Sequence, residues 1–213
     1  MGTNPRGLRM IAEQLRPRGI VDERILAAVA ELPREEFVAR EHRRLAYADH
    51  PIAIGRGQTI SQPLVVAAMT QAVAPGPEDL ALEVGTGSGY QAAVLARLCR
   101  RVVGVERDAE LATRGAAILA RLGIANAEIH HADGSLGWPS AAPYDVIVVS
   151  AAAVQVPASL VDQLAEGGRM VMPVAHSQDR PQDLLLLRKR QGRLETMTLF
   201  PVLFVPLLEG TAD

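Results

Sequence analysis

Apolar residues near the start of the chain recur with the period of an α-helix. One such run covers residues 8–15. A second begins after Asp22, a residue suited to capping a helix N-terminus, and ends at Pro33. Residues 34–60 show no clear period and contain both proline and glycine, so we expect an irregular, loop-rich segment there.

From residue 61 onward, helical and strand patterns alternate. Ser61 and Pro63 are expected to open a helix that extends to Val73. Short apolar runs typical of buried strands occupy residues 80–84, 102–106, 127–131, 144–150 and 169–174. Helical patterns between them occupy residues 90–98, 109–122 and 157–164. This alternation predicts an α/β fold with a mostly parallel, doubly wound sheet.

The C-terminal part of the chain has a third pattern. Short apolar runs without helices between them occupy residues 184–187, 193–199 and 202–207. They predict antiparallel strands at one edge of the sheet. Arg188-Lys189-Arg190, followed by Gln191-Gly192, is typical of the solvated tip of a hairpin. We therefore expect one domain over residues 1–213, with a cap of helices and loops at 1–60 and the core with its edge strands at 61–213.

Composition narrows the class of protein. The 213 residues are 48% hydrophobic and 22% charged, as in an average globular protein. A formal net charge of −2 argues against a nucleic-acid binder. No run approaches the roughly 18 apolar residues of a membrane span, and the N-terminus lacks the apolar block of a signal peptide. The only cysteine, Cys99, is expected in the core and fits a reducing compartment. We expect a cytoplasmic monomer with no membrane or nucleic-acid partner.

A glycine-rich loop follows the first predicted strand of the sheet. It reads Gly85-Thr86-Gly87-Ser88-Gly89, and glycines there allow the backbone to approach a ligand closely. A dinucleotide loop would have its third glycine at position 90, where Tyr90 stands. Glu83, two residues before the loop, would repel a pyrophosphate but would suit an ammonium group.

Two further acidic positions complete the pattern. Glu106 ends the next strand, where a carboxylate can hold both ribose hydroxyls. Asp133-Gly134 follows the third strand and lies at the edge from which an adenine amino group can be reached. Together these segments indicate an S-adenosylmethionine site. Its candidate residues are Glu83, Gly85, Thr86, Gly87, Ser88, Gly89, Glu106, Asp133 and Gly134.

The segment before the first core helix is the most specific in the chain. Residues 47–63 read Tyr-Ala-Asp-His-Pro-Ile-Ala-Ile-Gly-Arg-Gly-Gln-Thr-Ile-Ser-Gln-Pro. This run resembles the signature of the protein-L-isoaspartate O-methyltransferases. The resemblance continues, in the order of that family, through residues 83–95, 133–139, 142–145, 157–173 and 204–207.

The resemblance implies a fold, an activity and site residues. The fold would be a Rossmann-like class I methyltransferase sheet. The activity would be methyl transfer from S-adenosyl-L-methionine, with S-adenosyl-L-homocysteine as product, to the free carboxylate of L-isoaspartyl residues in damaged proteins and peptides, starting repair through a succinimide. Ser61 would be the catalytic serine, Thr59 would line both the cofactor and the substrate pocket, and Ile60 and Val205 would contact the substrate. Ser61 also suits an N-cap of the following helix, and the two roles are compatible.

Three positions depart from the pattern of that family. Ser150 stands where threonine is common and keeps the hydroxyl. Ala175 stands where glycine is common and could shift a loop near the site. Leu203 stands where arginine is frequent and could alter contacts with the peptide. These departures leave the reaction type unchanged but put the sequence preference for substrates in doubt.

Three other functions compete with protein repair. The first is a related methyltransferase that acts on one dedicated peptide. The second is a non-catalytic adenosine-binding module, against which the intact Ser61 segment argues. The third is a nicotinamide-dependent oxidoreductase, which Tyr90 and Glu83 disfavour. The histidines, His130, His131 and His176 among them, have no metal-ligand spacing, so no metal is expected.

Overall fold

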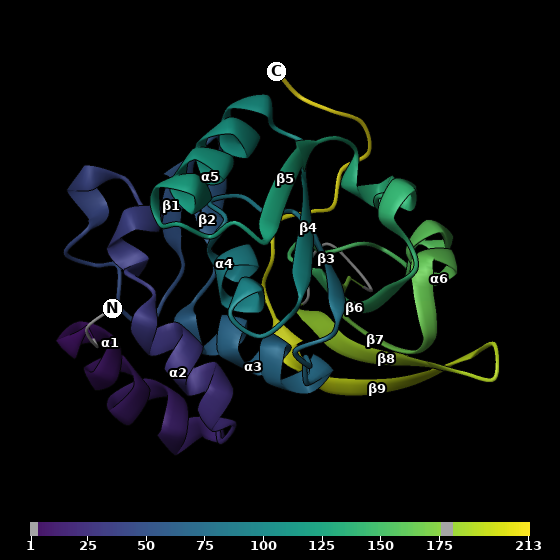
Figure 1. Ribbon diagram of the computed structural model, residues 1–213, viewed down its shortest axis with the longest axis horizontal. Helices are drawn as coiled ribbons and strands as arrows, with labels where there is room; N and C mark the ends of the chain where they lie inside the picture. The colour runs from purple at the N-terminus through teal and green to yellow at the C-terminus, as the bar shows by residue number, and fades with distance from the viewer. Residues whose placement is uncertain (1–3, 176–180) are drawn as a thin grey trace.

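Seven strands form one sheet in the order β5-β4-β3-β6-β7-β8-β9 (Figure 1). The computed structural model describes residues 4–175 and 181–213. The strands are β3 Leu80–Val84, β4 Arg101–Glu106, β5 Ala127–His131, β6 Tyr144–Val149, β7 Leu164–Val174, β8 Gln182–Arg190 and β9 Arg193–Val202. Neighbouring strands from β5 to β7 pair parallel, whereas β8 and β9 pair antiparallel. The predicted doubly wound sheet with an antiparallel C-terminal edge is confirmed.

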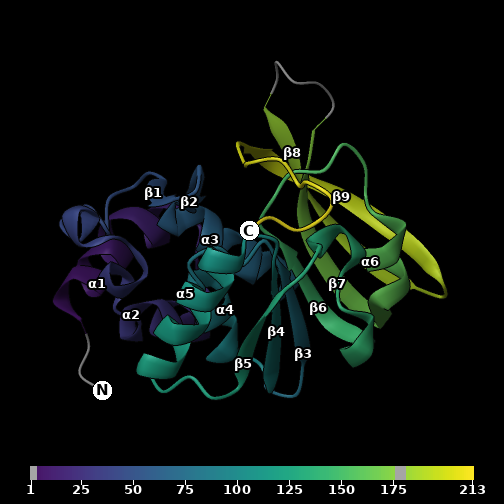
Figure 2. The same cartoon turned by 90° about the horizontal axis from the view of Figure 1, so that it is seen from above.

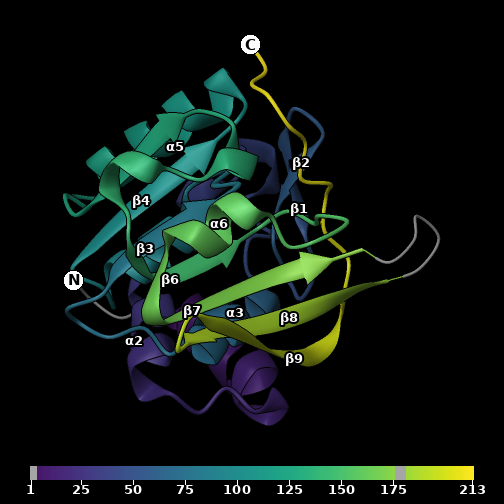
Figure 3. The same ribbon diagram turned by 90° about the vertical axis from the view of Figure 1, so that its right-hand side faces the viewer.

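Helices cover both faces of this sheet. The helices are α3 Pro63–Val73, α4 Tyr90–Ala96, α5 Ala109–Arg121 and α6 Ala158–Gln163. Figures 2 and 3 show α6 on the face opposite to the other three. Successive strand residues alternate accordingly: Ala81 belongs to the core cluster under α3, α4 and α5, whereas Leu82 and Val84 belong to the cluster with α6. Each strand therefore contributes to two cores.

The N-terminal segment packs on the side of α3 and α4. It contains α1 Pro5–Met10, the π-helical turn η1 Ile11–Leu15, the 3₁₀ turn η2 Arg16–Arg18 and α2 Glu23–Glu31. As predicted, Asp22 caps α2, accepting a hydrogen bond from the Arg24 N–H at 2.9 Å. Leu15 and Ile25 share one core cluster with Val102 of β4. Further 3₁₀ turns are η3 Arg34–Phe37, η4 Arg40–His42, η5 Gly134–Leu136 and η6 Pro139–Ala141.

Two segments differ from the sequence-based expectation. Residues 34–60 are not wholly irregular, because β1 (Ile52–Gly55) and β2 (Gln58–Ile60) pair as an antiparallel hairpin. The strand predicted at 202–207 is wrong, because β9 already extends to Val202 and the chain then leaves the sheet. That segment makes one isolated bridge, between Pro206 and Ala152. Its apolar residues line a groove and the neighbouring cavity, and Phe204 and Leu207 also pack on the two cores, which explains the misleading pattern.

The basic hairpin tip is confirmed as a turn but is not fully solvated. Gln191 and Gly192 have φ values of 51° and 70° and connect β8 to β9. Lys189 Nζ donates to the carbonyl oxygens of Val161 and Leu164 at 3.0 and 2.8 Å, and so satisfies the C-terminus of α6. Cys99 is buried in the core, as expected. Among the helices of the described ranges, none is long and apolar enough to cross a membrane.

Candidate active site

A cavity of about 410 Å³ opens at the carboxyl ends of β3, β4 and β6. The chain continues from β3 to β4 on one side and returns to pair with β3 through β6 on the other. Crevices at such a reversal of strand order are the usual ligand sites of open α/β sheets. Residues 205–208 and Ala212 form an outer wall of the cavity. Figure 3 shows this C-terminal segment running past the strand ends toward the β1–β2 hairpin.

The glycine loop forms the floor of this cavity. Gly85, Gly87 and Gly89 have φ values of 79°, 54° and 86°, which side chains with a Cβ rarely adopt. The Gly85 N–H donates to the Val105 carbonyl at 2.9 Å and the Gly87 N–H to Glu106 Oε2 at 2.8 Å. Gly85 and Gly87 line the cavity, whereas Gly89 is the N-cap of α4 and lines none of the hollows described here.

A small crevice of about 30 Å³ adjoins the cavity. The crevice is lined by Thr59, Ile60, Ser61, Val66, Glu83, Gly85, Thr86, Gly87, Ser88, Tyr90, Gln91 and Ser150. Thr86 and Ser88, both predicted to contact the cofactor, are buried here, and the Thr86 hydroxyl donates to the Val105 carbonyl. Both residues therefore lie beside the cavity, and the Thr86 hydroxyl serves the loop itself.

The two predicted glutamates are both buried but differ in their partners. Glu106 Oε2 accepts from Gly87 and its Oε1 accepts from the Asp108 N–H at 3.0 Å. Glu83 is 1% exposed, and its Oε2 has no hydrogen-bond partner among the described residues. Burial, and then the neighbouring charge of Glu106, raise the pKa of Glu83 well above its ordinary value. Glu83 is thus a buried carboxylate that lacks a counter-charge.

Gly134 lines the cavity, whereas its neighbour Asp133 does not. A Cβ added at Gly134 would lie 2.7 Å from Val84 Cγ1. Asp133 Oδ1 accepts from the backbone N–H and the hydroxyl of Ser135, and its Oδ2 accepts from the Gly210 N–H at 2.6 Å. The carboxylate therefore holds the C-terminal segment in place beside the cavity and is not part of the cavity wall.

An apolar groove of about 500 Å³ lies on the other side of Thr59. The groove is lined by Pro51, Thr59, Ser61, Gln62, Leu64, Val65, Ser150, Pro181, Phe200, Pro201, Val202, Leu203, Phe204 and Val205. Thr59 and Ser150 line the cavity, the crevice and the groove alike, and Ser61 lines the crevice and the groove. The three hollows therefore meet at these hydroxyl-bearing residues.

Ser61 does not cap the helix that follows it. The N-cap of α3 is Gln62, and no side chain makes a capping hydrogen bond there. The N-cap role that the sequence allowed for Ser61 is therefore wrong, because the helix begins at Pro63, one residue later than that role requires. The hydroxyl of Ser61 remains available to the hollows that it lines.

Sequence reasoning missed an ion pair at the mouth of the cavity. Arg56, in the β1–β2 turn, donates through Nε to Asp108 Oδ2 at 2.6 Å, and both residues line the cavity. Asp108 also caps α5 by accepting from the Leu111 N–H at 3.0 Å. The position of Asp108 just before a predicted helix was a usable signal for the cap. Nothing local indicated the pairing, since the two residues are 52 positions apart.

The two neighbouring histidines at the end of β5 have partners within the chain. The ring of His130 stacks on Trp138, with ring centroids 4.0 Å apart. His131 shares a hydrogen bond with the Arg107 carbonyl at 3.0 Å. His176 lies outside the described residues. Within residues 4–175 and 181–213, no three His, Cys, Asp or Glu side chains gather closely enough to hold a metal ion.

Comparison with known proteins agrees with this geometry. The family model described as protein-L-isoaspartate(D-aspartate) O-methyltransferase matches residues 8–212. The chain belongs to this family. A protein-L-isoaspartate O-methyltransferase from Methanoculleus marisnigri is 51% identical over 199 residues, which are 93% of this chain and 90% of the relative. One from Koribacter versatilis is 51% identical over 200 residues, 94% of this chain and 89% of the relative.

Solved structures of the same family share the fold. A protein-L-isoaspartate O-methyltransferase aligns with a TM-score of 0.86 and 31% identity, over 94% of this chain and 65% of the other. A structure described as that enzyme from Plasmodium falciparum, in complex with S-adenosyl-L-homocysteine, aligns with a TM-score of 0.82 and 28% identity, over 96% of this chain and 99% of the other. The fold is that of a class I methyltransferase.

Proposed function

We propose that this chain transfers a methyl group from S-adenosyl-L-methionine to the free carboxylate of L-isoaspartyl residues in damaged proteins and peptides. The observation that carries the proposal is the junction at Thr59, Ser61 and Ser150, where the polar cavity, the crevice and the apolar groove meet. A methyl donor in the cavity and an acceptor peptide in the groove would face each other at this junction. The family to which the chain belongs supports this reaction.

The residues around the cavity fit S-adenosyl-L-methionine. Glu83 Oε2 is buried and accepts no hydrogen bond from the described residues. The ammonium group of a methionine moiety would supply the missing donor. Each Glu106 oxygen accepts one backbone N–H and keeps lone pairs for ribose hydroxyls. Gly134 lines the cavity and, having no Cβ, packs its backbone against Val84, and we place the adenine beside it. We assign contact with the cofactor to Thr59, Glu83, Gly85, Thr86, Gly87, Ser88, Glu106 and Gly134. Gly89, as the N-cap of α4, and Asp133, which holds the C-terminal segment beside the cavity, have supporting roles in this proposal.

When bound, the sulfonium supplies a methyl carbon that is already activated toward nucleophiles. The residues of the chain then have to bind and align an acceptor, which in well-aligned cases is worth up to about 7–11 kcal/mol. An aspartyl-type carboxylate, with an ordinary pKa of about 3.9, is ionised at neutral pH. No side chain has to remove a proton. One carboxylate oxygen forms the new bond to carbon as the carbon–sulfur bond breaks, which gives the methyl ester and S-adenosyl-L-homocysteine. The ester can later cyclise to a succinimide.

Ser61 is the residue to which we assign the alignment of the acceptor. Its hydroxyl can donate to one carboxylate oxygen while the other oxygen attacks. A strong hydrogen bond would lower the nucleophilicity of the carboxylate, so we expect Ser61 to position the acceptor more than to polarise it. Thr59, Ile60 and Val205 line the adjoining surfaces and complete the substrate site in this proposal.

The broader expectations from the sequence are proposals of the same kind. We propose a single domain over residues 1–213, and the core cluster that joins the 1–60 cap to the sheet supports it. We also propose a cytoplasmic monomer that binds neither nucleic acid nor membrane. The net charge of −2 and the lone Cys99 support this assignment.

Matched peptides test the proposed reaction. Two peptides of one sequence, with either isoaspartate or aspartate at a single position, are incubated with labelled S-adenosyl-L-methionine, and release of S-adenosyl-L-homocysteine is followed. We expect methylation of the isoaspartyl peptide alone at a substantial rate, because its free carboxylate is attached directly to Cα, whereas normal aspartate carries its carboxylate one methylene further from the main chain. Equal rates for the two peptides would reject repair as the function.

A further inference from the structure

A fully buried arginine lies next to the proposed acceptor site. Arg34 begins η3 in the N-terminal cap and has no exposed surface. Among the described residues, no ion pair includes this guanidinium; its ionisable neighbours in the core are Tyr90 and Tyr47, whose pKa values burial raises, so that both are neutral at neutral pH. Burying a charge without a counter-ion costs several kcal/mol unless hydrogen bonds compensate it. Burial lowers the pKa of Arg34, but arginine stays charged in proteins.

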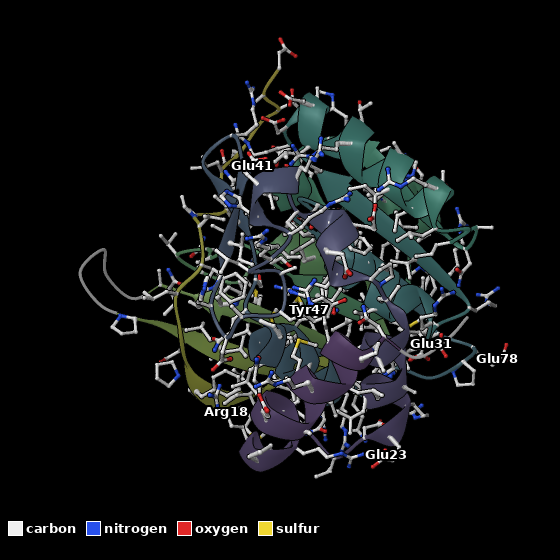
Figure 4. All side chains as sticks on the ribbon, turned by 90° about the vertical axis from the view of Figure 1, so that its left-hand side faces the viewer. Arg18, Glu23, Glu31, Glu41, Tyr47 and Glu78 are labelled. Carbon is white, nitrogen blue, oxygen red and sulfur yellow. The ribbon has the colours of Figure 1, made fainter. Side chains whose placement is uncertain are left out.

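The guanidinium connects three parts of the molecule. Its Nε donates to the Ala46 carbonyl at 2.7 Å, and its Nη2 donates to the Ser61 carbonyl at 2.5 Å. Its Cζ lies 4.5 Å from the ring centroid of Tyr90, the first residue of α4 after the glycine loop. The Arg34 backbone N–H donates in turn to the hydroxyl of Tyr47, which Figure 4 labels on the side of the molecule where the cap lies. The cap, the acceptor segment and the cofactor loop thus share one cation.

This contact acts on the short link between β2 and α3, through the peptide unit that joins Ser61 to Gln62. β2 ends at Ile60, where it pairs with Ile52, and α3 begins at Pro63. Ser61 lies between them, and its side chain is not used as a helix cap. A hydrogen bond to its carbonyl limits rotation of the following peptide plane and with it the direction of the Cα–Cβ bond. The planar fork of arginine can hold two carbonyls at once, which the single ammonium of lysine cannot do with the same geometry.

We infer that Arg34 is a positioning residue for methyl transfer: it fixes the Ser61 peptide unit so that the hydroxyl holds the acceptor carboxylate in line with the methyl donor. The inference rests on the proposed role of Ser61. A displacement of about 1 Å at a reacting group can cost on the order of 100-fold in rate. Arg34 lines neither the cavity, the crevice nor the groove, so in this proposal it touches neither the methyl donor nor the acceptor carboxylate.

Arg34→Lys, which keeps the charge, and Arg34→Gln, which keeps a donor, test this role. Calorimetric titration with S-adenosyl-L-homocysteine gives the affinity and, from its stoichiometry, the fraction of folded protein. We expect kcat on an isoaspartyl peptide, per folded molecule, to fall about 10- to 100-fold. The affinity for S-adenosyl-L-homocysteine should stay within about threefold of the wild type, because the guanidinium does not line the cavity.

Phe37→Leu is the matched control. Phe37 is buried and packs edge-on against the same Tyr90 ring, with centroids 5.2 Å apart, but it has no contact with the Ser61 carbonyl. Shrinking it should lower the melting temperature through lost packing and leave kcat per folded molecule within about twofold of the wild type. A loss of kcat in this control as large as in Arg34→Lys would show that any damage near Tyr90 is sufficient, and would overturn the inference.

A double-mutant cycle with Ser61→Ala separates this inference from the proposed function. If Arg34 acts through Ser61, Arg34→Lys should lower kcat less than about twofold in the Ser61→Ala background. The same 10- to 100-fold loss in both backgrounds would overturn the positioning role. Unchanged kcat in Ser61→Ala alone would instead reject the role of Ser61. Failure of both Arg34 variants to bind S-adenosyl-L-homocysteine would make the cation a folding requirement and also overturn the inference.

Discussion

Replacing Glu83 by glutamine should stabilise the ligand-free protein at alkaline pH and weaken its binding of S-adenosyl-L-homocysteine. Glu83 is 1% exposed, its Oε2 has no partner among the described residues, and burial followed by the charge of Glu106 raises its pKa. An acid whose folded pKa exceeds its unfolded value binds protons more readily when folded. The free energy of unfolding therefore falls as pH rises from the unfolded value, near 4.5, through the raised folded value.

The size of the effect follows from that difference. Each pH unit by which the folded pKa of Glu83 exceeds the unfolded one costs about 1.4 kcal/mol of stability at high pH. In a chain of this length, 1 kcal/mol shifts the melting temperature by about 2–4 °C. Glutamine cannot ionise and removes this pH-dependent cost. Any penalty for an amide hydrogen left without a partner is the same at every pH and cancels when two pH values are compared.

Thermal melts of the ligand-free protein at pH 5 and pH 8 measure the stability. The melting temperature of Glu83→Gln minus that of the wild type should be more positive at pH 8 than at pH 5. Glu128→Gln is the control: burial acts to raise the pKa of Glu128, but its hydrogen bonds and charge interactions with Arg101 and His130 together outweigh burial and lower it. A lowered pKa contributes stability that is present above the unfolded value, so this variant should lose stability at pH 8.

Calorimetry completes the test of Glu83. Loss of the charged partner for the ammonium should weaken binding of S-adenosyl-L-homocysteine by about 1.5–3 kcal/mol, or roughly 10- to 150-fold. A melting-temperature difference that does not depend on pH would refute the reasoning on burial and charge. Unchanged affinity would refute the assignment of Glu83 to the ammonium.

The remaining predictions concern the ribose, the reaction and the groove. Glu106→Ala should weaken S-adenosyl-L-methionine binding by about 1.5–3 kcal/mol while the protein still folds, and calorimetric affinity equal to that of the wild type would contradict the ribose assignment. Turnover at saturating substrates, followed by S-adenosyl-L-homocysteine release, should be nearly flat from about pH 6 to 8, whereas a persistent tenfold rise per pH unit would exclude a carboxylate acceptor. No charged side chain is among the described residues that line the groove, and Leu203 is 78% exposed beside it. Peptides with apolar residues flanking isoaspartate should therefore have a lower KM than acidic ones, and Leu203→Arg, which would attract acidic flanks, should reduce that preference; equal KM values in the wild type would argue against the groove as the peptide site.

Much of the fold could be predicted from local pattern alone. The strand at residues 80–84 coincides with β3, because buried parallel strands are short, continuous apolar runs bounded by turns. The strand at 127–131 has the bounds of β5, but the expected burial was wrong, because β5 is the edge strand and its residues are half-buried or exposed. β7 began five residues before the expected 169, because Leu164 follows α6 with no turn signal and pairs with Tyr144 across a register shift. The run at 202–207 led to a wrong prediction, since the lining of an apolar groove and a buried strand can both be continuous apolar runs. A run of apolar residues in the sequence does not reveal what covers those residues in the fold.

Part of the site was also determined by the sequence. Gly85 and Gly87 lie at the predicted place, because a loop at a strand end with positive φ values needs glycine. Glu106 lies beside them, because the next strand of a parallel sheet ends at the same edge. The resemblance of residues 47–63 located Thr59 and Ser61. These features depend on chemistry within a few residues of each other, or on the regular spacing of neighbouring strands.

Only the tertiary structure decided how distant segments complete the site. The Arg34 guanidinium reaches the Ser61 carbonyl across 27 positions, and the Asp133 carboxylate holds Gly210 across 77. Neither pair has a periodic or motif signal, because each depends on the packing of a cap or a C-terminal segment onto the finished sheet. The sequence gives the chemical type of each side chain. Its hydrogen-bond partner depends on which backbone groups the fold brings within about 3 Å of it.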